Sequence, residues 1–440
     1  MYLGLGQEIQ RRRYLLFFLI IVLISNAGLT LGADNRQIIK SEEILDKIRN
    51  HEPINYSSVI IEGDLCLWNV SSSIPTFIDS PIKIIDSEIR CNIYFNKSIF
   101  NRPVSFEKTK FNGIVRFDET VFREYANFGQ SVFNGPASFS GAKFRGSASF
   151  WKSTFSRIAT FRKSEFLEGS IDFHKSEFKD IAVFNFASFG GFEVTFESSY
   201  FNGTTDFRQA RFNGNAIFLG SRFKEDADFS GSQFNSSSNF LGSRFDRVLY
   251  FYKVKFKNLN INWDSIHHNL VSDEPGYIVL IKNFKDFGQF EDADNCYYEY
   301  RERKQHNMPF EWAKILTFLA WLTCGYGVRW THPIFSGLLV IMSFGIYYEM
   351  FDLEGIIRKN LFGRKALKDE TIKLSERLKK AFLFSMIVLL SLPPEWYPYG
   401  KEEYSKLINL HLFSAIIERL IGYGLMLLLI GTLTRLMVRY

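Results

Sequence analysis

Two acidic residues near the C-terminal end of the sequence stand where a carboxylate is costly. Glu418 lies with Arg419 inside the apolar segment HLFSAIIERLIGYGLMLLLIGTL (411–433), and Glu395 follows the apolar run AFLFSMIVLLSL (381–392). Charges inside a membrane are expensive unless they pair or face water, which makes these residues functional candidates. A ring of carboxylates in an oligomer favours cations. We therefore predict a pore lining that consists of Ser391, Pro393, Pro394, Glu395 and Glu418.

The same two acids have a second interpretation. Glu395 is then an ordinary interfacial acid beside Trp396 and Tyr397. Glu418 and Arg419 then extend from the helix end to the lipid headgroups, as long charged side chains do. Both interpretations stay open at the level of the sequence.

A second motif, TCGYG (323–327), differs by one residue from TVGYG, whose backbone carbonyls coordinate potassium in its channels. A filter needs a spanning helix ahead of its pore helix, but a polar stretch precedes Trp312, and the charged VRWTHP (328–333) leads directly into an apolar segment. We therefore predict that TCGYG ends an interfacial helix. SLPPEWYP (391–398) lacks TVGYG, and its prolines remove backbone donors, so it gives no basis for potassium selectivity.

Four apolar stretches would position these residues. Residues 312–328 fall short of the roughly 20 needed to cross a bilayer, so we expect an interfacial helix there. Residues 333–351 and 411–435 are predicted to be transmembrane helices. The short apolar run within 381–398 lies between them like a re-entrant pore segment. This order is the plan of a two-helix pore module.

Charge gives these segments a direction. Residues 352–380 hold nine Lys/Arg and five Asp/Glu, which places this loop in the cytoplasm. Arg11–Arg13 and the apolar run LLFFLIIVLI predict a signal peptide at 1–33, with an uncleaved N-terminal anchor as the alternative. In either case the following part is exported, and the re-entrant segment enters from the cytoplasmic face. If residues 312–328 also cross the membrane, the re-entrant segment enters from the outer face, which is the usual orientation of a pore segment.

Most of the remaining chain repeats. From Phe95, Phe recurs at alternating steps of five and six residues, slips by one residue at Phe173 and Phe196, and continues to Phe256. Five helical residues rotate by roughly 500°, which would place successive Phe on opposite faces. Gly and Ser in the repeats also disfavour a helix. The pattern predicts a β-solenoid with an inward column of Phe, whose core members include Phe139, Phe144, Phe150, Phe155, Phe161 and Phe166.

The repeated units, such as GPASF (135–139) and GSASF (146–150), have a small residue two positions before Phe. They resemble pentapeptide repeats of the Phe-centred variant. The resemblance implies a mainly β fold, a right-handed quadrilateral β-helix over residues 59–260, with roughly seven coils between Phe95 and Phe256. We expect a linker or N-terminal cap at 34–58. The spacing after Pro275 predicts an α-helical hairpin at 276–306, followed by the α-helical transmembrane region.

The C-terminal plan resembles the two-helix ion-channel-like module that accompanies pentapeptide repeats in some microbial membrane proteins. In those proteins, too, a short helix containing CGYG precedes the first span. The resemblance implies an oligomer if a pore forms.

Other chemistry is hard to find in the sequence. The four cysteines form no CxxC motif; Cys66 and Cys91 either pair in an exported domain or remain buried thiols. His267 and His268 have no third ligand at a suitable spacing. The first 300 residues hold 34 basic and 35 acidic residues, and this near-neutral balance argues against nucleic-acid binding. From Arg301 onward there are 19 basic and 12 acidic residues, so the positive excess lies in the part with the apolar segments. We expect no enzyme and no cofactor.

These observations predict a multi-pass protein of the cell membrane with an extracytoplasmic solenoid and an ion-channel-like module. Its partners would be the lipid bilayer, further copies of the chain if a pore forms, and a candidate protein on one solenoid face. The alternative is a membrane-anchored structural or adhesion protein of the cell surface without transport activity.

Overall fold

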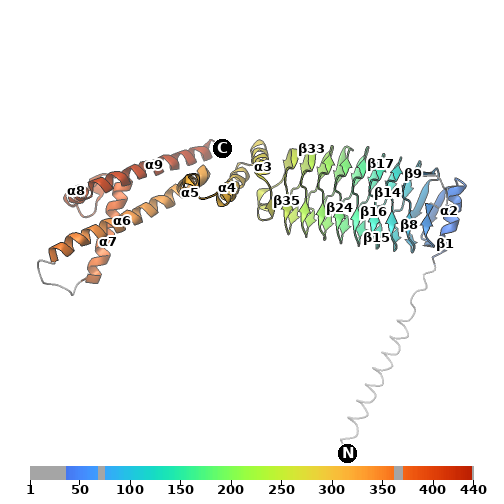
Figure 1. Cartoon of the computed structure of the whole chain (residues 1–440), viewed down its shortest axis with the longest axis horizontal. Coiled ribbons are helices and arrows are strands. Elements are labelled where there is room, and N and C mark those ends of the chain that lie inside the picture. The colour runs from blue at the N-terminus through green and yellow to red at the C-terminus, as the bar shows by residue number, and fades with distance from the viewer. Residues whose placement is uncertain (1–35, 68–74, 361–369, 439–440) are drawn as a thin grey trace, which may run out of the picture. The chain divides into compact units, whose positions relative to one another are not determined.

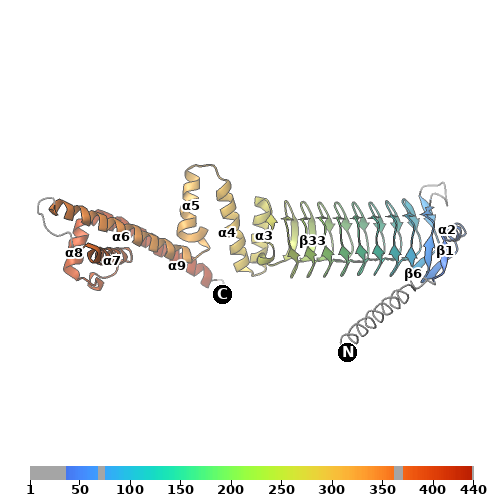
Figure 2. The same cartoon turned by 90° about the horizontal axis from the view of Figure 1, so that it is seen from below.

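The computed structural model describes residues 36–67, 75–360 and 370–438, and it consists of two units that divide between Asp273 and Glu274. The first unit is a β-solenoid and the second is helical (Figures 1 and 2). The signal peptide or anchor predicted at 1–33 lies outside the described residues.

The solenoid is built from short parallel strands stacked coil upon coil (Figure 1). One coil consists of β15 (Val132–Phe133), β16 (Ala137–Ser138), β17 (Lys143–Phe144) and β18 (Ala148–Ser149). Each strand pairs with the strand one coil away, as Val132 does with Thr154. Two sheets have ten strands each, so the solenoid has about ten turns, and a 17-stranded sheet covers the other two sides.

Phenylalanine fills the interior because each short strand turns one side chain inward. The six Phe residues named above are each 1% exposed or less. Their rings stack on those of the neighbouring coils: the centroids of Phe133 and Phe155 are 4.7 Å apart with an interplanar angle of 4°. Within a coil the rings meet edge to face, as Phe133 and Phe139 do at 83°. Both arrangements suit the ring quadrupole.

The corners recur every eleven residues and have a left-handed backbone. Lys97, Lys108 and Glu119 have φ angles of 56°, 56° and 57°, and Gly takes the same position at Gly141, where φ is 67°. A buried hydroxyl completes the corner. Ser153 Oγ donates to Phe128 O at 2.7 Å, and Ser131 Oγ donates to Phe106 O at 2.6 Å. The corner carbonyl thereby gains a partner in the interior, which a buried polar group requires.

The two slips in the repeat fall at one corner in successive coils. Ala148 pairs with Ile171, and Ile171 pairs with Val194, so each of these coils has one extra residue. The extra residues lie near Gly169 and at Gly190–Gly191. A Cβ on Gly191 would lie 2.0 Å from Gly169 O, so the two enlarged corners stack only because a glycine is there.

The solenoid extends beyond the predicted residues 59–260 at both ends. It begins with β1 (Ile38–Lys40) and ends with β37 (Leu270–Val271). Residues 34–58 were predicted as a linker or cap; their described part holds β1, β2 (Ile54–Ser57) and α2 (Ser41–Arg49), whose Ile44, Leu45 and Ile48 are buried. The terminal coils use aliphatic residues in place of Phe, so the spacing of Phe does not indicate where the solenoid begins and ends.

The helical unit starts with a hairpin of α3 (Glu274–Asp286) and α4 (Phe290–Asn307). Next come α5 (Trp312–Cys324), the 3₁₀ turn η3 (Gly325–Gly327) and α6 (Thr331–Asn360). The remaining elements are α7 (Glu370–Leu389), η4 (Pro394–Trp396), α8 (Lys401–Leu410) and α9 (Leu412–Met437). Helix α7 starts well before the re-entrant segment predicted at 381–398, because the polar residues ahead of the apolar run 381–392 continue the helix. Helix α8 was not predicted from the sequence.

Helices α6, α7 and α9 pack against one another in one bundle (Figures 1 and 2). By length and composition, residues 331–351 of α6 and 412–437 of α9 are long and apolar enough to cross a membrane.

Candidate functional site

A buried carboxyl group lies where α6, α7 and α9 meet. Tyr348 Oη of α6 donates to Glu418 Oε2 of α9 at 2.7 Å. Ser385 Oγ of α7 contacts Glu418 Oε1 and also lies 3.2 Å from Ile341 O of α6. Glu418 is 0% exposed. We call Tyr348, Ser385 and Glu418 the three-helix polar site; its hydrogen bonds join all three helices.

The helices approach closely at this site because glycine lies in their contacts. A Cβ on Gly345 of α6 would lie 2.3 Å from Phe382 Cδ1, and a Cβ on Gly422 of α9 would lie 2.1 Å from Leu389 O. Small residues allow this kind of contact between membrane helices. Aromatic rings then surround the polar site: the centroids of Tyr348 and Phe384 are 5.0 Å apart.

The neighbours Glu418 and Arg419 point to different partners. Arg419 Nη2 donates to Tyr404 Oη of α8 at 2.8 Å, whereas Glu418 faces α6 and α7. A second pair joins α6 to α7, where Glu349 Oε1 lies 3.0 Å from Arg377 Nη2 and the Glu349 side chain is 7% exposed. Sequence reasoning missed the partners Tyr348, Ser385 and Arg377. The sequence did contain a signal for these contacts, because Glu349 and Ser385 are polar residues inside apolar runs and therefore need partners.

The other predicted lining residues follow the end of α7. Ser391 has a φ of 51° and a buried Oγ, Pro393 is exposed, and Pro394 begins η4. Glu395 is exposed and pairs with Lys401 at 2.9 Å. Glu395 and Glu418 thus have partners on different elements, and each is satisfied within a single chain.

The chain turns back along α7 after that helix ends. Leu389 lies against Gly422 of α9 and near Gly337, in the first part of α6. A few residues later, Tyr397 Oη donates to Lys380 O at 3.4 Å, and Lys380 Nζ lies 2.6 Å from Glu403 Oε1. The chain after Leu389 therefore runs back from the end of α7 toward its middle, where α8 begins.

The TCGYG motif forms the end of a helix. Gly325, with φ 51° and ψ 50°, is the left-handed C-cap of α5, and its N–H is directed to Ala320 O and Trp321 O. Tyr326 Oη contacts Gln305 Oε1, and burial raises the pKa of Tyr326 to about 12. This arrangement follows the usual chemistry of glycine at a helix end. The motif has the conformation of a capped helix.

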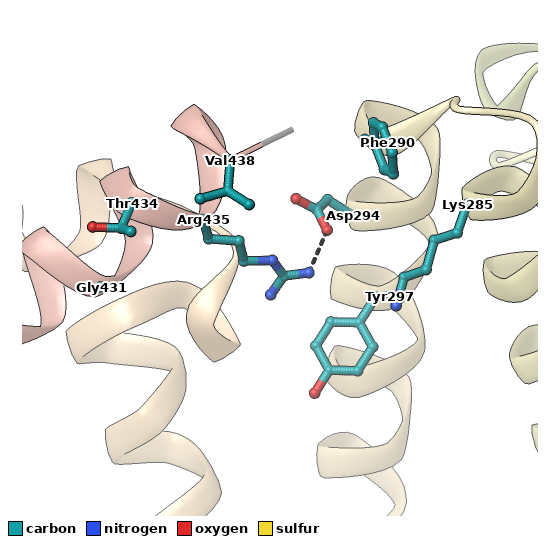
Figure 3. A pocket seen from close by; sticks show the side chains of 8 residues that line it. All are labelled: Lys285, Phe290, Asp294, Tyr297, Gly431, Thr434, Arg435 and Val438. Carbon is teal, nitrogen blue, oxygen red and sulfur yellow. Dashed lines mark hydrogen bonds and ion pairs between the residues drawn. The ribbon is translucent and has the colours of Figure 1, made fainter. Parts of the chain in front are cut away.

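An arginine fixes this capped end to α9 and α4. Arg435 Nη1 donates to Gly327 O at 3.0 Å, and Arg435 Nη2 pairs with Asp294 Oδ1 at 2.7 Å (Figure 3). The Asp294 side chain is 9% exposed. Arg435 and Asp294 line a pocket, to which Lys285 and Tyr297 also contribute (Figure 3). The pair therefore holds the last turn of α9 against the hairpin.

His267 and His268 are the two residues that the sequence offered as candidate metal ligands. His267 and His268 have ring centroids 3.7 Å apart. Among residues 36–67, 75–360 and 370–438, no group of three His, Cys, Asp or Glu side chains is placed to hold a metal ion.

The comparisons with known proteins concern the solenoid. Residues 95–143, 128–169 and 207–255 match the family model described as pentapeptide repeats (9 copies). No curated protein and no solved structure matches the chain. The repeat and β-solenoid predictions are confirmed. The first unit is a pentapeptide-repeat solenoid, and the helical unit that follows it contains two helices suited by length and composition to crossing a membrane.

Proposed function

We propose that this chain is an integral membrane protein whose helical unit anchors and orients the solenoid as a binding scaffold. The observation that carries the proposal is that the three-helix bundle has apolar side chains on its outside and polar groups in its interior. Phe413, Leu420 and Leu427 of α9 are 78%, 64% and 70% exposed, whereas Glu418 on the same helix is fully buried. Apolar side chains outside and hydrogen-bonded polar groups inside suit a lipid environment.

The distribution of charge supports an orientation. Residues 352–380 include the end of α6 and the first half of α7, and their excess of Lys and Arg favours the cytoplasm. The opposite end of α6, next to α5 and η3, is then on the outer side. Helix α5 has 13 residues, about 20 Å of helix, which is too short to span. Its exposed Trp312 and Leu316 suit an interfacial position. On this basis the solenoid is extracytoplasmic.

Fractionation and protease access test this proposal. We expect the full chain to stay in membranes after alkaline carbonate washing, and the solenoid to be digested in intact spheroplasts. Leu427→Arg places a charge on the exposed face of α9 and should weaken insertion by about 2.5–3.5 kcal/mol. Lys179→Glu, on the solenoid surface, is the matched control and should not change insertion. Release of the wild-type chain by carbonate overturns the proposal, and full protection of the solenoid overturns its orientation.

Cation conduction by an oligomer is a second candidate function, favoured by the path of the chain at α7. A helix that ends part-way along its neighbours and a segment that turns back after it are both features that a re-entrant pore segment would need, and they support this candidate. Ser391, Pro393, Pro394 and Glu395 at the turn are the residues that would line the pore. Glu418 would contribute by fixing α7 through Ser385.

Flux into proteoliposomes tests conduction. Glu395→Gln should lower cation flux without a change in the size of the assembly, because the carboxylates concentrate cations at the pore. Glu402→Gln, at an exposed position in the first turn of α8, is the matched control. Correctly inserted wild-type protein that passes no cations excludes this candidate and leaves the anchored scaffold.

A further inference from the structure

We infer that the apolar pocket between α6, α7 and α9 binds one acyl chain of a membrane lipid. The pocket has a volume of about 270 Å³, and every residue that lines it is Pro, Ile, Gly, Leu or Met. Gly337 of α6, Leu389 of α7 and Gly422 of α9 come together there. The inference rests on the proposed membrane location of the helical unit.

The pocket has an open side and a closed side. Ile334, Leu338 and Met426 line it and are 45%, 55% and 45% exposed, so its mouth lies on the outer surface of the two candidate spans. Leu389 and Leu425 are 4% and 8% exposed and form its inner part. In a bilayer, the medium at such a mouth is hydrocarbon.

Water and a second helix fit this pocket poorly. A water molecule needs two to four polar partners, and an apolar cavity of about 150 Å³ in another protein stays dry and binds benzene. This pocket is nearly twice as large. A helix with its side chains is about 10–12 Å across, so a second copy of the chain can contribute a side chain at most. A single acyl chain matches the wholly apolar lining and the small volume of the pocket.

The position of the pocket gives the acyl chain a role beyond filling space. Leu389 and Leu390 line the pocket and immediately precede Ser391, where the chain turns back. An acyl chain in the pocket would pack against Leu389 and Leu390 at the end of α7. Bound lipid would thereby stabilise the turn that begins at Ser391.

Gly337 offers a direct test because its missing side chain helps to form the pocket. A Cβ there has only Leu389 Cδ2 nearby, at 3.9 Å, so the position has room for a side chain, and we expect Gly337→Leu to fill part of the pocket. Gly424→Leu is the matched control: Gly424 is in α9, and nothing lies within 4 Å of its added Cβ. Both variants add the same apolar group to a helix.

The experiment measures lipid retained by the full-length protein. Each protein is purified in detergent with dioleoyl phosphatidylcholine, exchanged into lipid-free detergent and examined by native mass spectrometry. We expect wild type and Gly424→Leu to retain one lipid, and Gly337→Leu to show at least about tenfold lower occupancy, equivalent to ~1.4 kcal/mol. Glycerophosphocholine, which has the headgroup without acyl chains, should not be retained.

Several outcomes overturn the inference. These are equal retention by all three proteins, retention of glycerophosphocholine, or a change in oligomeric state of Gly337→Leu alone, which would assign the pocket to a second copy. If Gly337→Leu does not fold, Met426→Phe narrows the mouth in its place. Carbonate release of the wild-type chain would refute the membrane proposal itself, whereas a membrane-retained chain without bound lipid refutes only this inference.

Discussion

Tyr348 and Glu418 are 70 residues apart in the sequence, yet the tyrosine hydroxyl donates a 2.7 Å hydrogen bond to the glutamate carboxyl. The bond joins α6 to α9 inside the helical bundle, and Ser385 adds α7 from the other side of the carboxyl. A buried polar group of this kind is costly to leave unpaired, so each member depends on the others.

We predict that Tyr348→Phe destabilises the helical unit by about 1–2 kcal/mol, because it leaves the Glu418 carboxyl with one partner fewer. In a Glu418→Leu background the sign should change: the tyrosine hydroxyl is then the unpaired group, and Phe should be neutral or stabilising. Unfolding in mixed detergent, followed by circular dichroism, measures all four proteins. Equal losses in both backgrounds would show that the hydrogen bond contributes nothing.

In the solenoid, Phe150→Ala should lower the free energy of unfolding by about 3–5 kcal/mol, as for other buried aromatic truncations. The Phe150 ring stacks between Phe128 and Phe173 at centroid distances of 5.1 and 4.8 Å. Asn134→Ala is the control. Its side chain donates to Asn112 on the surface at 2.8 Å, and its loss should cost about 1 kcal/mol. Denaturant melts that give the two variants the same stability would refute the assignment of the core.

Thiol chemistry gives a third prediction. Burial raises the pKa of Cys91 to about 12, and burial also raises the pKa of Cys66. At pH 8 roughly one Cys91 thiol in ten thousand is then ionised, and the thiolate is the reactive form. Iodoacetamide should therefore modify Cys91 only after denaturation, as peptide mass spectrometry would show. A Cys66–Cys91 disulfide in the native protein, or rapid native labelling of Cys91, contradicts this prediction.

Cys324→Val creates the sequence TVGYG but should create no potassium selectivity. Residues Thr323 and Cys324 belong to α5, Gly325 caps that helix, and the Gly327 carbonyl accepts from Arg435. The Gly325 carbonyl accepts from Val328 N at 3.2 Å, so two carbonyls of the motif already have donors within one chain. Rubidium and sodium flux into proteoliposomes should match that of wild type. The appearance of selective rubidium flux in this variant would show that the capped conformation opens in the membrane.

The sequence was most informative where contacts repeat at a fixed distance along the chain. The Phe period fixes which side chains face inward, since every coil places the next Phe over the last. The hydroxyl residues, such as Ser153, also recur at the small position two residues before Phe. The carbonyl that each contacts lies in another coil, as Phe128 O does 25 residues before Ser153, and residue types alone do not identify it. The slips at Phe173 and Phe196 show in the sequence that two coils have an extra residue, but the position of these residues at the corners near Gly169 and Gly191, and the coils outside residues 59–260, require the structure.

The helical unit was less predictable because its contacts follow no period. Hydropathy identifies the apolar stretches of α6 and α9, and the cost of a charge identifies Glu418. Helical periodicity gives the face on which Glu418 lies, but not the helix that covers that face. Tyr348 and Ser385 become its partners through the antiparallel packing of α6 with α7 and α9, which depends on glycine contacts such as Gly422 with Leu389 O.

The regular corner geometry has a consequence for how this kind of protein changes over generations. Most coils use 22 residues, as the pairing of Val132 with Thr154 shows, and neighbouring strands are about 4.8 Å apart. A duplication or deletion of 22 codons with both ends at equivalent corners preserves every ring stack and every corner. The solenoid can thus become longer or shorter in steps of about 5 Å while both terminal coils stay intact. The length of the solenoid can therefore change one coil at a time without a change in its cross-section.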